Sequence, residues 1–182
     1  GSSTALKSDP AALALIDEYD EMMANVKGQG DVLGLVEARG ETYADFVTAI
    51  TSTPARGLVE IEPYDTSGLE FWARSAPDDL ESPIWKLWQE GTRHHWAWPC
   101  RHCEEYFIPR FKQLRWPDRA TPAQAKQAAT LECPRCGGQH SEADKVWMNA
   151  RGAMVAPGQR VEFKDDAPRV TGAPADSSTL SM

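Results

Sequence analysis

Two pairs of cysteines have the residue types and the spacing that could hold a metal ion. Cys100 and Cys103 form one Cys-x-x-Cys pair, Cys133 and Cys136 form a second, and 29 residues separate the pairs. Both thiolates of such a turn can reach one ion, and two turns complete the tetrahedral set of four sulfurs that Zn²⁺ accepts. The alternatives are a redox pair of the thioredoxin kind, unrelated core thiols or two disulfides. The spacing favours a structural zinc site, because four protein ligands leave no open position for substrate.

The residues beside the cysteines fit the same interpretation. Gly137 follows the second pair, where a tight turn with backbone amides aimed at the sulfurs needs an unhindered residue. His102 and His140 are rival ligands, but a complete set of four cysteines needs neither, so we expect both histidines at the surface. The N-terminus has no signal-peptide layout, and the cysteines therefore also indicate a reducing compartment.

A second pattern is a short apolar run that ends in two carboxylates. Residues 11–16 predict a fully apolar strand, and Asp17 and Glu18 follow it at once. Phosphoryl transfer to water needs a carboxylate near Mg²⁺ and a second group that orients or deprotonates the attacking water. Alternating side-chain directions at the strand end let Asp17 face the metal and Glu18 reach that water. Taken alone the pattern is weak, because apolar strands commonly end in solvated turn acids.

The elements that must position these carboxylates form a β-α-β unit. Residues 31–45 have a helical pattern with Asp31 as the N-cap. Residues 47–52 are β-branched and apolar, and Pro54 ends the run. Strand, helix and strand at this spacing predict two parallel strands joined by a right-handed crossover.

The second predicted strand ends in hydroxyl side chains. Thr51, Ser52 and Thr53 would lie at the tip of the strand beside Asp17. P-loop ATPases place a polar motif at this position, where it senses the γ-phosphate. The sequence therefore favours one half of an ATP site.

The phosphate-binding half of such a site is missing from the sequence. No G-x-x-x-x-G-K-[ST] motif occurs in the 182 residues, and Gly28-Gln29-Gly30 is no substitute because no Lys-Ser/Thr follows it. The chain also begins without Met and stops after a polar run. We therefore expect a piece of a longer polypeptide whose phosphate-binding loop lies upstream.

Composition places the chain among soluble globular proteins, with 41% hydrophobic and 25% charged residues. No apolar run approaches the roughly 20 residues of a membrane span, so membrane-spanning, secreted-peptide and collagen-like classes are excluded. The net charge of −8 is uneven: residues 1–99 carry −10, residues 100–160 carry +4 and residues 161–182 carry −2. A basic block in an acidic chain is a weak indication of a nucleic acid partner.

The ordered series of these motifs resembles one known family, the large terminase subunit of tailed bacteriophages in its lambda-like branch. The resemblance covers nearly the whole chain, and its parts occur in the expected order although each alone is unspecific. The matching parts are LIDEYD at 15–20, GQGD at 28–31, ARGETY at 38–43, TSTP at 51–54, CRHC at 100–103, CPRCG at 133–137 and STLS at 178–181.

The resemblance implies part of an ATP-driven motor that packages double-stranded DNA into procapsids. Asp17 would be the Walker B acid, associated with Mg²⁺, and Glu18 the catalytic base. Thr51, Ser52 and Thr53 would form the coupling motif that relays the state of the γ-phosphate to DNA-gripping elements. The implied cofactors are ATP and Mg²⁺, beside the structural Zn²⁺.

The implied partners are the terminase small subunit, the portal of the procapsid and further copies in a homo-oligomeric ring, in the host cytoplasm and without a membrane. A metal-dependent nuclease would follow in the complete protein. We expect negligible ATP hydrolysis from these 182 residues alone, because they lack the Walker A loop. Arg56, directly after the coupling motif, and Arg39 are candidate phosphate sensors or arginine fingers.

The predicted fold class is α/β: a partial P-loop NTPase sheet of the ASCE type followed by a zinc-ribbon β region. Residues 1–92 would be the C-terminal half of the ATPase domain, from the Walker B motif to the coupling motif. Residues 93–157 would form the zinc ribbon, and residues 158–182, rich in Pro, Gly, Asp and Ser, a linker toward the nuclease domain. Residues 83–91 predict a short helix that carries tryptophans, and residues 94–98 a short strand.

Two other functions stay open at this point. Asp17-Glu18-Tyr19-Asp20 also satisfies the D-E-x-D pattern of superfamily 2 helicases, which predicts a second RecA-like lobe after the zinc region. A zinc-ribbon module that binds nucleic acid, with the α/β half as scaffold, is the non-catalytic alternative.

Aromatic and basic side chains of the second half have two interpretations. Trp85 with Trp88, and Trp96 with Trp98, could stack on bases, but their spacing favours core positions. The pair at 94–95, both histidines, is expected at the surface. Basic side chains between the cysteine pairs could meet DNA phosphates, although a solvated face is favoured; they are Arg110, Lys112, Arg115, Arg119 and Lys126.

Overall fold

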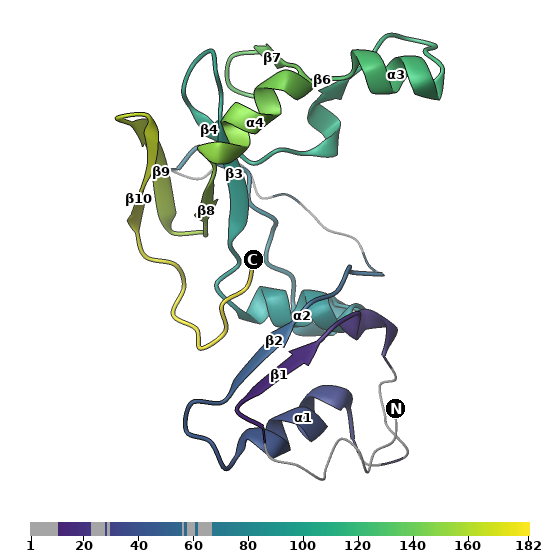
Figure 1. The fold of residues 1–182 in the computed structure, drawn as a ribbon, viewed down its shortest axis with the longest axis vertical. Coiled ribbons are helices and arrows are strands. Elements are labelled where there is room, and N and C mark those ends of the chain that lie inside the picture. The colour runs from purple at the N-terminus through teal and green to yellow at the C-terminus, as the bar shows by residue number, and fades with distance from the viewer. Residues whose placement is uncertain (1–10, 23–27, 29, 56, 58–60, 62–66) are drawn as a thin grey trace. The chain divides into compact units, whose positions relative to one another are not determined.

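The computed structural model describes residues 11–22, 28, 30–55, 57, 61 and 67–182, and the chain divides into two compact units (Figure 1). The first unit contains residues 1–58 and 75–87, and the second contains residues 59–74 and 88–182. The division falls near the predicted boundary at residue 92, but residues 59–74 join the second unit. None of the helices in the described ranges combines the length and the hydropathy that a membrane span requires.

The first unit is built on a pair of parallel strands, as the sequence predicts. β1 (Leu13–Ile16) and β2 (Val47–Ile50) pair residue for residue, from Leu13 opposite Val47 to Ile16 opposite Ile50. Their connection contains α1 (Val32–Gly40), whose N-cap Asp31 accepts a hydrogen bond from the Gly34 N–H at 2.9 Å. The predicted strands, helix and cap are therefore confirmed.

α1 ends at Gly40, before the predicted end at residue 45. The Phe46 ring packs against this glycine, and a Cβ atom there would lie 2.0 Å from the ring, so a larger residue would require Phe46 to move. The Tyr43 N–H donates to the Gly40 carbonyl at 2.8 Å and turns the chain toward β2. The crossover is therefore tighter than its sequence pattern indicated.

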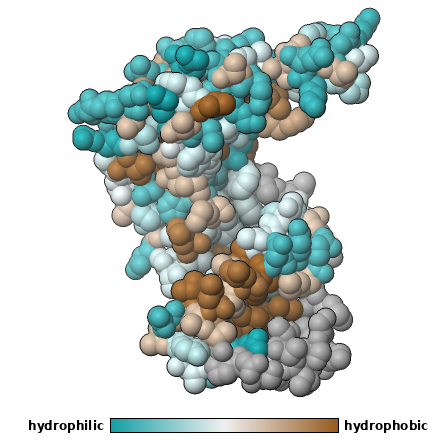
Figure 2. Space-filling model, in the orientation of Figure 1, coloured by the Kyte–Doolittle hydropathy of each residue, from teal (hydrophilic) through white to brown (hydrophobic). Residues whose placement is uncertain are grey.

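The hydrophobic side chains of the strand pair are only partly covered. Ile16 is buried, whereas Leu13, Leu15 and Val47 are 57%, 76% and 56% exposed. Figure 2 shows hydrophobic side chains gathered over β1 and β2. Parallel sheets are normally covered on both faces. Within the described residues, the predicted P-loop sheet is represented by this strand pair.

The predicted helix with tryptophans is α2 (Pro83–Glu90). Ser82 begins it, since its hydroxyl accepts from the Trp85 N–H at 3.2 Å and its carbonyl accepts from the Lys86 N–H at 3.0 Å. Trp85 and Trp88 are both buried, which confirms the core positions predicted for this pair. Short 3-10 helices stand at Tyr19–Glu21, after β1, and at Pro77–Asp79, before α2.

The second unit has β3 (His95–Pro99) as its central strand. β3 pairs antiparallel with β4 (Tyr106–Phe107) on one side and with β8 (Ala153–Val155) on the other. One face of this sheet packs into a hydrophobic core. Its buried members are Leu69, Phe71, Ala97, Tyr106, Ile108, Ala153 and Val155.

The other face of β3 carries Trp96 and Trp98, which the sequence placed in the core. Trp96 is 39% exposed, and both indole N–H groups donate to Asn149 Oδ1, at 3.0 and 3.3 Å. The core prediction is therefore wrong for Trp96. Side chains alternate between the faces of a strand, and here Ala97 and Pro99 are on the buried face.

A smaller sheet in the order β5-β6-β7 carries the second cysteine pair between its last two strands. Its strands are β5 (Leu114–Arg115), β6 (Thr130–Glu132) and β7 (Gln139–His140), and α3 (Pro122–Ala128) lies between β5 and β6. β5, α3, β6 and β7 form an arm of the second unit, and Figure 1 shows α3 at its outer end. A 3-10 helix at Phe111–Gln113 precedes β5, and α4 (Glu142–Ala150) follows β7.

Residues 158–182 do not form the linker that the sequence predicts. β9 (Gln159–Lys164) and β10 (Ala167–Gly172) form an antiparallel hairpin. Asp165 and Asp166 at its tip have positive φ angles of 54° and 60°, as two-residue turns of type I′ require. Val161 and Phe163 alternate along β9 and pack against the core of the second unit. This alternation of apolar and polar residues indicates a strand, and the prediction of a linker from composition overlooked it.

The last residues of the chain dock at the start of β3. Ser181 is 6% exposed, and its hydroxyl donates to the Trp88 carbonyl at 2.8 Å and accepts from the Arg93 N–H at 2.7 Å. Its carbonyl accepts from the His94 N–H at 2.8 Å. A segment whose composition indicated a linker is thus a folded part of the second unit.

His95 lies in the core of the second unit and not at the surface. It is 5% exposed, and its ring packs edge-on against Phe71 and Trp72, with centroids 5.3 and 5.2 Å away. Nδ1–H donates to the Arg93 carbonyl at 2.9 Å, while Nε2 accepts from the Trp72 N–H at 3.2 Å, so the ring is the neutral Nδ1–H tautomer. Burial, reinforced by the charge of Arg110, lowers the pKa of His95 from 6.5 to about 4.

We expect acid to destabilise the second unit through His95. Below the ordinary histidine pKa the unfolded chain binds a proton that the folded ring excludes down to a pKa of about 4, so the free energy of unfolding falls as the pH falls through this window. The loss between about pH 7 and about pH 5 amounts to about 2 kcal/mol. Urea unfolding at the two pH values measures it.

His95→Phe, whose ring binds no proton, should lose this part of the pH dependence. His94→Phe is the matched control and should keep it, because His94 lies outside the core. The same pH dependence in both variants and in the parent chain would contradict the assignment to His95.

Candidate functional site

The four cysteines converge on one point, as their spacing predicts. The sulfurs all lie within 4.8 Å of one another, with Cys100 Sγ 3.7 Å from Cys136 Sγ and Cys103 Sγ 4.0 Å from Cys133 Sγ. Sulfurs that share one Zn²⁺ at about 2.3 Å stand about 3.8 Å apart, the edge of a tetrahedron of that radius. The four sulfurs are thus close to the positions that a shared ion requires.

The first cysteine pair lies in a turn whose backbone amides face the sulfur. The Cys100 N–H donates to the Glu105 carbonyl at 3.0 Å, and the Cys100 carbonyl accepts from the Glu104 N–H at 2.9 Å. The His102 N–H points to Cys100 Sγ at 3.3 Å. An N–H directed at sulfur favours the thiolate, which is the form that binds zinc.

The second pair repeats this turn. The Cys133 N–H donates to the Gly138 carbonyl at 2.8 Å, and the Cys133 carbonyl accepts from the Gly137 N–H at 2.9 Å. Gly137 has a φ of 73°, and Glu104, at the equivalent place of the first turn, has a φ of 62°. Both turns need left-handed backbone here, which is the reason for the glycine that the sequence singled out.

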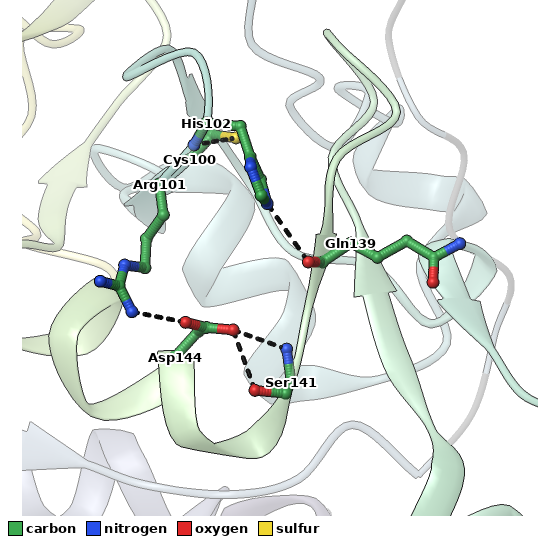
Figure 3. A network of polar contacts seen from close by, with 6 residues as sticks. All are labelled: Cys100, Arg101, His102, Gln139, Ser141 and Asp144. Carbon is green, nitrogen blue, oxygen red and sulfur yellow. Dashed lines mark hydrogen bonds and ion pairs between the residues drawn. The ribbon is translucent and has the colours of Figure 1, made fainter.

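Polar contacts hold the first turn to α4 and β7 (Figure 3). Arg101 donates to Asp144 Oδ1 at 2.6 Å, and Asp144 Oδ2 accepts from the N–H and the hydroxyl of Ser141 at 2.8 and 2.9 Å. The bonds from Ser141 and then Arg101 lower the pKa of Asp144 to about 2. His102 Nε2 lies 3.3 Å from the Gln139 carbonyl and so links the two turns.

His140, which the sequence placed at the surface, is buried. It is 2% exposed, its ring centroid lies 5.0 Å from that of His102, and it stacks 6.2 Å from that of Phe107. Burial lowers its pKa. The His102 ring also explains Gly138, where a Cβ atom would lie 2.4 Å from the imidazole. The histidines pack the two turns together and stand outside the cluster of four sulfurs.

The chemistry of this cluster fits a metal ion such as Zn²⁺. Burial raises the pKa of the Cys100 and Cys103 thiols, whereas the Gly138 N–H lowers that of Cys136. Four sulfurs are the soft ligand set that Zn²⁺ takes in closed, structural sites. The arrangement can hold an ion, and it leaves no ligand position for a substrate.

The carboxyl ends of β1 and β2 bring Asp17 and Thr51 together. The Thr51 hydroxyl donates to Asp17 Oδ1, which also accepts from the Glu18 N–H at 3.0 Å. The Asp17 side chain is exposed, and its Oδ2 has no hydrogen bond to any described residue. One carboxylate oxygen is therefore fixed by its neighbours and the other faces solvent.

Asp20 joins three segments of the first unit, a role that sequence reasoning missed. Its Oδ1 accepts from the Ile84 N–H at the start of α2 at 2.8 Å, and its Oδ2 accepts from the Ala55 N–H at 2.9 Å. Its own N–H donates to Ser52 Oγ at 2.9 Å. Both carboxylate oxygens are thus bound by backbone amides, including one at a helix N-terminus that has no partner within its helix.

The side chains of the other predicted site residues lie apart from the hydrogen bond between Thr51 and Asp17. Glu18 and Thr53 are exposed, and the Thr53 carbonyl accepts from the Ser52 hydroxyl at 3.5 Å. Arg39 is half-buried and lines, with Phe46 and residues of β1, a hollow of about 250 Å³. Arg56 lies outside the described residues.

Parallel strands whose carboxyl ends join an aspartate to a threonine, in a chain with a four-cysteine cluster, are the features expected of an ATPase domain with a metal-binding portion. The sequence matches the family model of the phage terminase large subunit gpA, ATPase domain, over residues 1–153. The chain therefore belongs to the terminase large subunit family, which confirms the resemblance of its motifs. No curated protein and no solved structure matches the chain.

We expect the purified chain to contain one zinc ion per molecule. Cys133→Ser should release it and unfold the second unit, because structural zinc supplies folding free energy, while β1, β2 and α1 should keep their structure. Atomic absorption gives the metal content, and amide hydrogen exchange separates the two units.

His102→Ala is the control, because it removes a side chain of the same turn that is no ligand, and it should keep the zinc. Folded protein without zinc, or two disulfides under non-reducing conditions, would contradict the metal site.

Asp20→Ala should destabilise the first unit by about 1–3 kcal/mol, because two backbone N–H groups lose their acceptor. Asp20→Asn, which keeps one acceptor oxygen, should lose less. Asp45→Ala is the matched exposed control. Urea unfolding followed by tryptophan fluorescence measures all three, and equal stabilities of the two alanine variants would refute the bridging role.

Proposed function

We propose that the chain is part of the ATP-hydrolysing motor of a phage terminase large subunit that translocates double-stranded DNA into procapsids. The hydrogen bond between Thr51 and Asp17, across the ends of parallel strands in a member of this family, carries the proposal. Phosphoryl-transfer sites use a carboxylate near Mg²⁺, and the resemblance to terminases implies that the hydroxyl residues on the neighbouring strand couple hydrolysis to motion.

Asp17 has the role of the Walker B acid in this proposal. Thr51 and the Glu18 N–H fix its Oδ1, so Oδ2 would be the oxygen left to bind a cation or its water. Mg²⁺ bound with ATP would supply neutralisation of the phosphate charge there. Glu18 follows directly and is exposed, so it orients or deprotonates the attacking water.

Thr51, Ser52 and Thr53 are the coupling motif of this proposal. A change of charge at Asp17 alters the hydrogen bond that Thr51 donates to it. Ser52 is bonded to Asp20, and Asp20 holds the first turn of α2. A shift at the strand end can therefore reach a helix through the backbone from Thr51 to Ser52 and the hydrogen bonds of Asp20. Arg39 and Arg56 are the proposed phosphate sensors or arginine fingers.

The four cysteines hold a structural Zn²⁺ in this proposal and take no part in hydrolysis. The proposed partners are double-stranded DNA, the terminase small subunit, the portal and further copies in a ring, in the host cytoplasm. A nuclease in the same protein would cut concatemeric DNA. Family membership is the support for these partners.

The helicase alternative is less favoured, because the family model that matches the chain over residues 1–153 is that of a terminase ATPase domain.

In a longer protein that carries a phosphate-binding loop, Glu18→Gln should reduce ATP hydrolysis by about 10²-fold or more and leave ATP binding nearly unchanged, because an amide is no base. Phosphate release and nucleotide-binding titrations measure the two effects. Glu21→Gln, an exposed carboxylate three residues on, is the control and should stay active. Full hydrolysis by Glu18→Gln would remove Glu18 from the mechanism.

A further inference from the structure

Two aromatic side chains stand exposed beside each other at the base of the arm that carries α3. Phe111 is 78% exposed and Trp116 is 47% exposed, and their ring centroids lie 6.0 Å apart with the planes tilted by 54°. Neither ring belongs to a hydrophobic cluster of the second unit. Single exposed aromatics are common, but a neighbouring pair presents a continuous apolar surface to water.

The backbone below Phe111 is fixed by its neighbour Arg110. The Arg110 guanidinium lies 4.6 Å from the Trp72 ring centroid and donates to the Glu70 carbonyl at 2.9 Å. The Arg110 N–H also donates to the side chain of the buried Gln113 at 2.9 Å. The Phe111 ring takes no part in these contacts and stays exposed beside the fixed backbone.

The backbone below Trp116 is fixed in the same manner by Arg115. Its guanidinium donates to both carboxylate oxygens of Glu132 on β6, at 2.9 and 3.2 Å, and to the Lys112 carbonyl at 2.7 Å. These bonds tie the segment between the two aromatics to the sheet. A surface whose parts are already fixed loses little conformational entropy when a ligand binds.

The segment of the chain that carries the pair is rich in basic residues, although the whole chain carries −8. Between residues 110 and 130 the sequence has five Lys and Arg residues and one acid, Asp118. Arg119 and Lys126 are exposed, and Lys112 is 54% exposed although it pairs with Glu70 at 3.0 Å. Cations that follow phosphates and rings that stack on bases are the two parts of surfaces that bind unpaired nucleic acid strands.

We propose that Phe111 and Trp116 form a platform on which bases of an unpaired DNA strand stack, with Arg119 and Lys126 meeting its phosphates. The choice of DNA over RNA rests on the proposed function. Duplex DNA hides the faces of its bases in the stack, so both rings are used only at a single-stranded segment or a frayed end. A protein partner would have to neutralise the same cations and would bring no base to the rings.

The test is binding of the 182-residue chain to a fluorescent oligothymidylate of about 20 nucleotides, followed by anisotropy, beside a duplex and an oligouridylate of the same length. Phe111→Ala and Trp116→Ala should each weaken binding of the oligothymidylate by at least about fivefold, because each removes one stacking partner. Trp116→Phe should keep most of the affinity. Arg119→Gln should lower the slope of log affinity against log salt by about 0.7.

The matched control is Tyr43→Ala, which removes an aromatic side chain of the first unit that is 42% exposed, and it should bind like the parent chain. If the thermal unfolding of the variants is unchanged, their loss of affinity is due to the missing rings and not to a loss of structure. The proposal would be overturned if the double variant Phe111→Ala/Trp116→Ala bound the oligothymidylate as tightly as the parent chain. It would also be overturned if the double variant lost as much affinity for the duplex as for the oligothymidylate. Capture of an acidic protein that the double variant no longer binds, while DNA binding is unaffected, would overturn it as well. The Glu18→Gln assay is independent of these results and tests the proposed function by itself.

Discussion

The convergence of four cysteine sulfurs on one point is the constraint on which the second unit depends. The strands around it, β4 to β7, are two or three residues long and too short to be stable as independent sheets. Cys100 and Cys133 are buried with Phe107 and Met148 in one hydrophobic cluster, so the same turns supply ligands and core. A cation bound there would link two distant segments, and the arm between them can extend outward because its ends are fixed.

The first unit follows a different principle, because the polar side chains at the ends of its parallel strands stay open to solvent. Asp17 and Thr51 are positioned by parallel strand pairing, while Asp20, three residues further on, is fully engaged by backbone amides. The two neighbouring acids therefore differ physically: Asp17 keeps one carboxylate oxygen without a hydrogen bond to any described residue, whereas both oxygens of Asp20 accept from backbone amides. Leu13 and Leu15 on β1 remain largely exposed in the same unit.

Recognisable sequence motifs predicted much of this. The Asp31 cap and the Gly137 turn depend on neighbouring residues, the parallel strands follow from a strand-helix-strand pattern, the cysteine cluster follows from two Cys-x-x-Cys pairs, and all four are as predicted. The failures depend on distant partners. His95 is buried by aromatic residues of a separate segment. Residues 159–172 form a hairpin, which a prediction from composition missed because it did not consider the alternation of apolar and polar residues. Asp20 could not be assigned from its motif, because its partners are 35 and 64 residues away.

The docking of Ser181 determines the order in which the second unit can assemble. Its hydrogen bonds to the Trp88 carbonyl and the Arg93 N–H span 93 and 88 positions of the chain. Contacts of such long sequence separation form late, since the closure entropy of the intervening loop must be met first. During synthesis the hydrogen bonds of Arg93 and His94 to Ser181 therefore cannot form until residue 181 has left the ribosome. The cysteine turns, β8 and the β9–β10 hairpin are all translated before that final contact closes the unit.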